Sequence, residues 1–219
     1  MHALYKFISG PMVWAAFGLF LGGCLFRISQ LVSLTRRKER FIFSFLSIRY
    51  SLRSIVHWMT PFAAVNMRKH PVMTMVAFAF HICLLLAPVF LLAHIVLLEE
   101  AWDIQWWTLP DVVADGMTLI VVAACIFFLV RRITQPEVQY VTSASDYGIL
   151  AMVAAPFVSG FYCSLDLPGY QTMVIVHMLS GEIMLAAIPF TRLVHMIFAA
   201  FTRSYTGSEF GAVRHAKDW

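Results

Sequence analysis

The chain has 219 residues, of which 60% are hydrophobic and only 13% are Asp, Glu, Lys or Arg. So few charges cannot cover the surface of a soluble domain, and the composition therefore excludes that class and predicts a single integral membrane domain over residues 1–219. The formal net charge is only +4, and we expect membrane lipid, not nucleic acid, to surround the chain.

Five apolar segments are long enough to cross a bilayer, whose hydrocarbon core takes about 20 helical residues. They cover residues 11–34, 71–98, 110–130, 147–165 and 171–201. No basic region followed by a small-residue cleavage site precedes the first segment, so we expect it to be retained as a span. The sequence predicts an all-α membrane protein, a bundle of five transmembrane helices, with Ser145 or Asp146 as the N-cap of the fourth.

The basic residues predict the orientation of this bundle. All of the 16 Lys and Arg except Lys6 fall on one side of the membrane if the N-terminus is outside. Because Lys and Arg are retained in cytoplasmic loops, we expect the N-terminus outside and the C-terminus in the cytoplasm.

Between the first two spans, residues 41–60 have the pattern of an amphipathic helix lying in the cytoplasmic membrane interface. One face would carry Ser44, Ser47, Ser51 and Ser54, and the other Phe41, Phe45, Leu52, Ile55 and Met59. Either lipid or a docked soluble subunit could cover the apolar face.

Two of the apolar segments carry two histidines each. His177 and His195 are 18 residues apart, which in one continuous helix is five turns, on one face and about 27 Å apart. His81 and His94 lie in segment 71–98. Imidazoles inside a membrane need partners, so these are either interior histidines bonded to neighbouring helices or functional groups. Four imidazoles on two helices can form two bis-histidine sites, and haem iron is the metal that suits them best.

The spacing of His81 and His94 is less regular. They are 13 residues apart, which leaves them on different faces of an ideal helix. Pro88 lies between them and is able to kink the helix, so that both rings would turn toward the fifth span.

Three further residues of the fifth segment are candidate cofactor contacts. Arg192 lies one turn before His195, where it would bind a lipid phosphate or a haem propionate. Gly181, one turn after His177, would let a porphyrin lie against the helix or would allow close helix packing. Glu182 would be protonated and hydrogen-bonded, or would exchange protons with a quinone.

The cysteines exclude two other cofactors. The chain has four, and no C-x-x-C or C-x-x-C-H motif occurs. Covalently attached haem c and iron–sulfur clusters must therefore belong to partner proteins.

Two sequence patterns resemble a known family. The motifs HMLSGE and IPFTRLVH, with their 18-residue histidine spacing, resemble the last span of the respiratory nitrate reductase gamma subunit family of dihaem b cytochromes. The motif FHICLLLAPVFLLAH and the EEAW after it resemble the cytochrome b subunits of transmembrane redox complexes of sulfate-reducing bacteria, relatives of heterodisulfide reductase membrane subunits.

The resemblance implies two haems b, with His94 and His177 as ligands of the outer one and His81 and His195 of the inner one. It implies an electron-transfer subunit of a bacterial inner-membrane oxidoreductase complex in anaerobic respiration or sulfate reduction, without catalytic residues of its own. Electrons would pass between a quinone pool, with menaquinone a candidate, or a periplasmic multihaem cytochrome c, and a cytoplasmic iron–sulfur subunit.

Three alternatives stay open at the level of sequence. The first is an electron wire that uses no quinone. The second is a haem-free transporter, which would want charged groups near the midplane, where Glu182 stands alone. The third is a haem-free anchor for a soluble oxidoreductase, in which the histidines are incidental.

Overall fold

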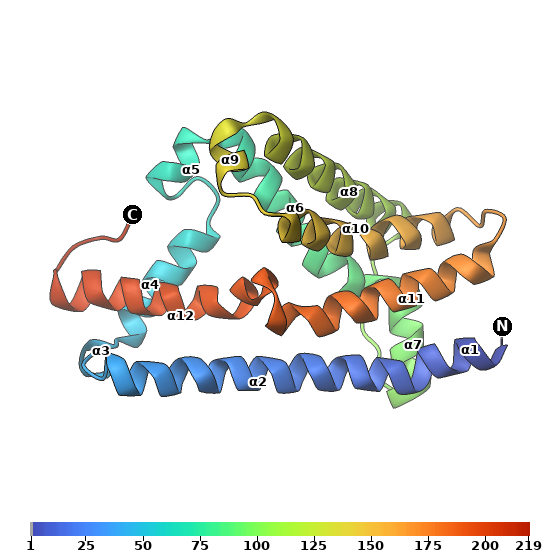
Figure 1. The fold of residues 1–219 in the computed structure, drawn as a ribbon, viewed down its shortest axis with the longest axis horizontal. Coiled ribbons are helices and arrows are strands. Elements are labelled where there is room, and N and C mark those ends of the chain that lie inside the picture. The colour runs from blue at the N-terminus through green and yellow to red at the C-terminus, as the bar shows by residue number, and fades with distance from the viewer. Residues whose placement is uncertain (1) are drawn as a thin grey trace. The chain divides into compact units, whose positions relative to one another are not determined.

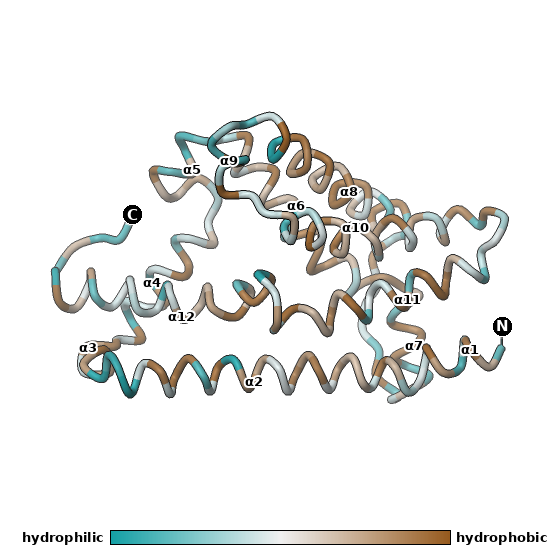
Figure 2. The backbone as a smooth tube through the Cα atoms, viewed as in Figure 1, coloured by the Kyte–Doolittle hydropathy of each residue, from teal (hydrophilic) through white to brown (hydrophobic). Residues whose placement is uncertain are grey.

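The computed structural model describes residues 2–219, and within that range the chain forms helices and no β-strand. Five helices are long and apolar enough to cross a membrane: His2–Lys38, Pro71–Phe90, Asp111–Thr134, Ala144–Ser164 and Tyr170–Phe190. The predicted all-helical class with five candidate spans is confirmed, and the chain is a multi-pass membrane protein by this criterion. Figure 2 shows apolar residues running along these helices.

The chain divides into two compact units. The first contains the described residues up to Gly10 together with Met75–Met184, and the second contains Pro11–Thr74 and Leu185–Trp219. The first span is continuous in sequence between them and consists of α1 (His2–Phe7), a π-helical turn η1 (Ile8–Met12) and α2 (Val13–Lys38). The interpretation of the chain as one domain stays a prediction.

The first unit is built around α6 (Pro71–Phe90), α8 (Asp111–Thr134) and α10 (Ala144–Ser164). Cys83 and Ala87 of α6 pack in one cluster with Val121 and Cys125 of α8 and Phe157 of α10. Helices α8 and α10 lie side by side (Figure 1). The short helices α7 (Leu92–Trp102) and α9 (Pro136–Tyr140) and the long helix α11 (Tyr170–Ala187) complete this part of the chain.

The second predicted span, 71–98, is wrong as a continuous helix. Helix α6 contains Pro88 and ends at Phe90, and Leu91 has extended dihedral angles of φ −74° and ψ 128°. Helix α7 has 11 residues and is therefore about 16 Å long, too short to cross a bilayer.

Side chains and loop backbone satisfy the carbonyl groups that this break leaves without intrahelical donors. The His94 ring bonds the carbonyl of Pro88 through Nδ1, at 2.8 Å. The Trp106 indole donates to Val89 O at 2.9 Å, and the backbone N–H of Leu109 donates to Phe90 O at 2.9 Å. These three hydrogen bonds stabilise the break between α6 and α7, and His94 forms one of them.

The fifth predicted span, 171–201, is also interrupted. Helix α11 ends at Ala187 and is followed by two 3-10 turns, η2 (Ile188–Phe190) and η3 (Arg192–Val194), before α12 (His195–Ser208) begins. Pro189 has no N–H to continue the helix, and Thr191 is extended at φ −119° and ψ −174°. His177 and His195 do not share one continuous helix, and the five-turn spacing expected for them is wrong.

The fourth span begins slightly earlier than predicted. Its N-cap is Ser143, whose backbone N–H donates to Asp146 Oδ2 at 2.8 Å. Ser145 and Asp146, the predicted N-caps, therefore lie inside the first helical turn, where an acidic side chain also complements the helix dipole.

The second unit contains α2, α12, the short helices α3 (Ile42–Phe45), α4 (Ile48–Met59) and α5 (Val65–Lys69), and a π-helical turn η4 (Glu209–Val213). Helix α4 packs along α12 (Figure 1). Gly207 makes this contact close, because a Cβ atom there would lie 2.5 Å from both Ser54 Cβ and Tyr50 O. The serine face of the predicted amphipathic helix is therefore its packed face, with Ser51 and Ser54 buried.

The opposite face of α4 is apolar and exposed. Ile48 is 80% exposed and Met59 is 71% exposed, with Leu52 and Val56 between them. Over Ile48–Met59 the buried serines and the exposed apolar residues lie on different faces. The helix does not extend back to residue 41, because Leu46 and Ser47 are extended. Its place in the membrane interface stays a prediction.

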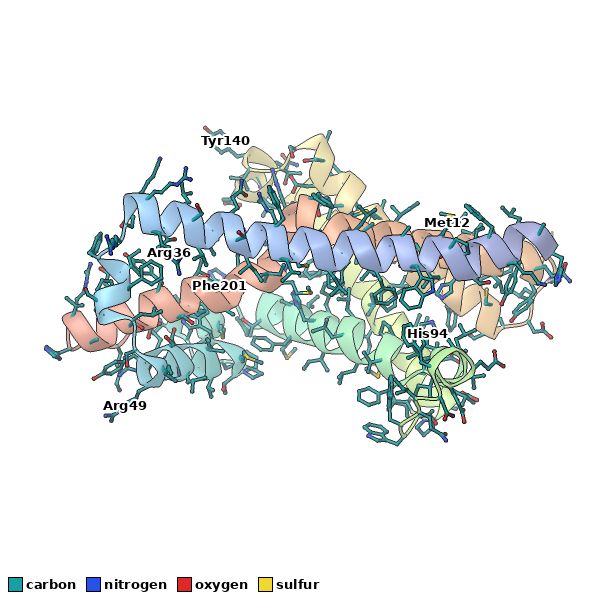
Figure 3. The ribbon with its side chains drawn as sticks, turned by 90° about the horizontal axis from the view of Figure 1, so that it is seen from below. Met12, Arg36, Arg49, His94, Tyr140 and Phe201 are labelled. Atoms are coloured by element: carbon teal, nitrogen blue, oxygen red, sulfur yellow. The ribbon has the colours of Figure 1, made fainter. Side chains whose placement is uncertain are left out.

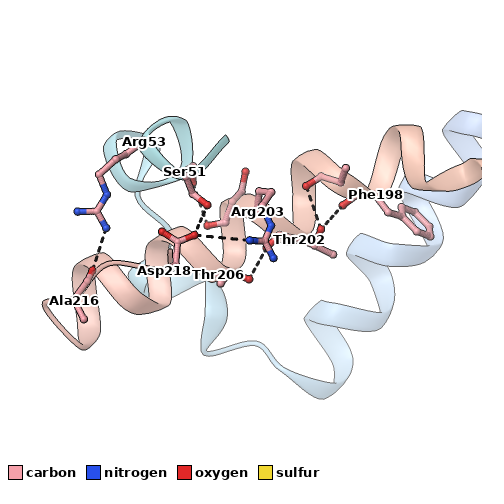
Figure 4. A network of polar contacts seen from close by, with 11 residues as sticks. Ser51, Arg53, Phe198, Thr202, Arg203, Thr206, Ala216 and Asp218 are labelled. Atoms are coloured by element: carbon pink, nitrogen blue, oxygen red, sulfur yellow. Dashed lines mark hydrogen bonds and ion pairs between the residues drawn. The ribbon is translucent and has the colours of Figure 1, made fainter. Parts of the chain in front are cut away.

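The C-terminal residues fold back onto α4 and α12 (Figure 4). Ser54 donates to Asp218 Oδ2 at 2.5 Å, and Arg203 of α12 lies 3.9 Å from the same oxygen. The His57 ring stacks on Trp219 with centroids 3.9 Å apart. These contacts tie the chain end to the α4–α12 pair.

Candidate functional site

Two of the predicted ligand histidines lie next to each other in the first unit. His94 (labelled in Figure 3) comes from α7 and His177 from α11. Their ring centroids are 5.9 Å apart, with planes inclined by 18°. Both side chains are half-buried. Two imidazoles from different helices therefore lie side by side with nearly parallel planes.

The hydrogen bonds of these rings fix which nitrogen is able to bind a metal. His177 Nδ1 lies 2.8 Å from Pro156 O, and His94 Nδ1 lies 2.8 Å from Pro88 O. A carbonyl oxygen only accepts, so Nδ1 carries the proton in both rings and Nε2 of the neutral imidazole has the lone pair. Metal-binding histidines are oriented in this way, with the other ring nitrogen bonded to a carbonyl.

Gly160 lets the His177 ring approach α10. A Cβ atom at residue 160 would lie 2.9 Å from His177 Cε1 and 3.1 Å from Nδ1, closer than side-chain atoms pack. The imidazole reaches the Pro156 carbonyl because residue 160 has no side chain. Ser159 Oγ also lies 3.4 Å from His177 Nδ1.

The centroid separation of the pair is compatible with two imidazole ligands on one metal ion. Metal–nitrogen bonds to imidazole are about 2.0 Å, which places the centroids of two opposed ligand rings roughly 6 Å apart. Within residues 2–219 no cluster of three or more His, Cys, Asp or Glu residues is suited to a metal ion. A haem bound here would take His94 and His177 as its protein ligands and would supply the redox chemistry.

The other two histidines make the same kind of backbone contact. His81 Nδ1 lies 2.7 Å from Ala77 O, and His195 Nδ1 lies 2.9 Å from Arg192 O. His81 belongs to the first unit and His195 to the second. Their pairing as an inner site stays a prediction, as does a role for Arg192, which lies in η3.

Two further candidates lie on α11. Gly181 has open space where a Cβ atom would stand, so close packing within the described chain does not explain it. Both carboxyl oxygens of Glu182 are buried and have no hydrogen-bond partner among residues 2–219. A carboxyl group in that state is costly unless it is protonated or meets a ligand.

Sequence reasoning did not find the groups that orient the outer pair. These are the carbonyls of Pro88 and Pro156 and the missing side chain of Gly160. Pro88 and Pro156 were indications of these carbonyls in the sequence, because a proline in a membrane helix disturbs the backbone hydrogen bonding around it. The partner of each carbonyl, however, depends on tertiary contacts.

The fold and the paired rings together define a class: a multi-pass membrane protein of five candidate spans with two adjacent imidazoles from different helices. The chain is 34% identical over 215 residues to a protein of Nitratidesulfovibrio vulgaris, with 96% of this chain and 95% of that one aligned. The chain belongs to the same family as that protein, whose name, "Protein", describes no activity. No family profile and no solved structure matches the chain.

Proposed function

We propose that this protein is a dihaem b membrane subunit that carries electrons across the bacterial cytoplasmic membrane. His94 and His177 would hold the haem nearer the outer surface, and His81 and His195 the haem nearer the cytoplasm. The haems supply the redox chemistry, and the chain positions them and tunes their potential through ligand identity and burial.

The pair of His94 and His177 is the observation that carries the proposal. The rings come from two different helices, stand 5.9 Å apart, and each engages a backbone carbonyl through Nδ1. Histidines with a purely structural role would need only the hydrogen bonds from Nδ1 to the carbonyls. Such a role does not require two nearly parallel rings whose Nε2 atoms have no hydrogen-bond role in the described part of the chain.

Glu182 supports a quinone as the electron donor or acceptor. Quinone reduction and oxidation exchange protons as well as electrons, and both oxygens of this buried carboxyl lack a partner within the described chain. If Glu182 exchanges these protons, Glu182→Gln should retain both haems but slow their reduction by a menaquinol analogue. Unchanged reduction would favour an electron wire fed by a periplasmic cytochrome c.

The proposed orientation in the membrane places the cytoplasmic end of the electron-transfer path. With the N-terminus outside, α4 and the C-terminal residues face the cytoplasm, where an iron–sulfur subunit would dock. The exposed apolar face of α4, from Ile48 to Met59, would lie in the lipid interface.

The test is a pyridine haemochrome assay on purified wild type and on Ala variants of His81, His94, His177 and His195. We expect two haems per chain in the wild type. Loss of one haem should be common to the His94 and His177 variants, and loss of the other to the His81 and His195 variants. His70→Ala, which changes an exposed histidine before the second span, is the matched control and should retain both.

A wild-type protein without reduced b-type absorption bands would overturn the proposal in favour of a transporter or a haem-free anchor. Haem content unchanged in the His177→Ala variant would overturn the assignment of the outer pair.

A further inference from the structure

A pocket of about 410 Å³ lies in the second unit between α2 and α12. Helix α2 contributes Arg27 and Arg37, Gln30 and Ser33 and two leucines, and α12 contributes Phe198. The polar residues recur along one face of α2, at intervals that bring them to the same side of the helix. The haem proposal uses none of these residues.

The guanidinium group of Arg27 is fixed by two contacts, but one of its N–H donors has no acceptor within the described chain. Its Nη1 donates to Gln30 Oε1 at 2.7 Å, and its guanidinium group lies 5.5 Å from the centroid of the Phe198 ring. Its Nε is buried and has no hydrogen-bond acceptor among residues 2–219. Neither Arg27 nor Arg37 forms an ion pair with a carboxylate in that range.

The position of Arg27 in the first span matches the depth of lipid phosphates. Between Lys6 and Arg27 the sequence runs for 20 residues without a charge, and a helix of that length covers about 30 Å, the thickness of the hydrocarbon core. Arg27 is thus the first charged residue after the uncharged stretch 7–26, which would place it near the lipid headgroups if that stretch fills the hydrocarbon core.

We propose that this pocket binds the headgroup of an anionic phospholipid. Phosphodiester oxygens would accept from the Nη atoms of the Arg27 guanidinium group and from Arg37, which leaves the Gln30 amide and the Ser33 hydroxyl for headgroup hydroxyls. An acyl chain would lie against the two leucines and Phe198. Two arginines without carboxylate partners favour an anion over a neutral quinone ring, which would leave both charges uncompensated.

The experiment uses full-length, delipidated protein in detergent and measures lipid binding by native mass spectrometry. Dioleoyl phosphatidylglycerol and dioleoyl phosphatidylcholine have the same acyl chains and differ in headgroup charge. We expect phosphatidylglycerol to bind the wild type and Arg27→Gln to weaken this binding about tenfold, as for loss of a charged hydrogen bond. Arg36→Gln, one residue outside the pocket on the same helix (Figure 3), should bind like the wild type.

Arg37→Gln provides a second variant at an exposed position, should Arg27→Gln fail to fold, and is also expected to weaken binding. Three results would overturn the proposal: equal binding of phosphatidylcholine, phosphatidylglycerol binding unchanged in both pocket variants, or displacement of the lipid by a menaquinone analogue. Equally tight binding of soluble glycerol phosphate would retain the phosphate chemistry but reject the lipid as its source.

Discussion

At the scale of single residues, a glycine decides whether the His177 ring can occupy its place. The imidazole lies against α10 where Gly160 has no side chain, and it bonds the Pro156 carbonyl there. The candidate ligands could be chosen from the sequence, because a polar imidazole in an apolar segment needs a partner. The role of Gly160 does not, because it depends on which helix faces His177.

Gly160→Ala should displace the His177 ring and lower the affinity for the outer haem about 10–100-fold, the usual effect of disturbing the groups that orient a metal ligand. The measurement is haem content after titration of the apoprotein with haemin. Gly148→Ala on the same helix has open space for its methyl group and should leave haem binding unchanged. Equal haem affinity in both variants would show that ring position does not depend on residue 160.

At the scale of elements, two expected spans are each interrupted within two residues of a proline. Pro88 precedes His94 by six residues, and Pro189 precedes His195 by the same interval. In both places a histidine Nδ1 meets a backbone carbonyl near the break. Hydropathy alone predicted continuous helices here, because residues on either side of each break are equally apolar.

Trp106→Phe should destabilise the break after α6 by about 1 kcal/mol, because Val89 O loses its indole donor. Thermal unfolding in detergent measures the change. Trp107→Phe, which keeps the stacking on Phe90 at 4.3 Å, should cost less. If both variants unfolded together with the wild type, the indole bond would have no part in stabilising the break.

The end of α12 should respond to acid. Hydrogen bonds from Arg214 and Tyr205 hold the pKa of the half-buried Glu209 below its ordinary value of 4.5. The folded state therefore favours the ionised carboxylate, and its stabilisation is complete above pH 4.5 and is lost as the pH falls through the lower, folded-state pKa.

We expect Glu209→Gln to remove this part of the pH dependence, measured as the difference in thermal midpoint between wild type and variant from pH 7 to pH 3. The difference should shrink toward zero at the acid end. Glu137→Gln, at an exposed glutamate of α9, should behave as the wild type. A wild-type midpoint that differs from that of Glu209→Gln equally at pH 7 and pH 3 would contradict the assignment.

At the scale of the whole molecule, composition was sufficient to predict five apolar spans and an all-helical fold, because bilayer thickness sets helix length. The division into two compact units could not be predicted, since it depends on contacts between distant segments. Residues 185–219 belong with 11–74, while most of α11 belongs with α6 to α10.

The distribution of basic residues predicts the orientation of the whole chain. All of the 16 Lys and Arg except Lys6 fall on the proposed cytoplasmic side. A green fluorescent protein fused after Trp219 should therefore fluoresce in bacterial cells, and an alkaline phosphatase fused there should be inactive. The reverse pattern would place the C-terminus outside and invert the proposed electron path.

A density map of the purified wild-type protein, determined by cryo-electron microscopy, tests the haem proposal most directly. The proposal predicts one planar macrocycle held by His94 and His177 and a second macrocycle held by His81 and His195. Continuous side-chain or lipid density in the space between His94 and His177, with no planar group, would contradict it.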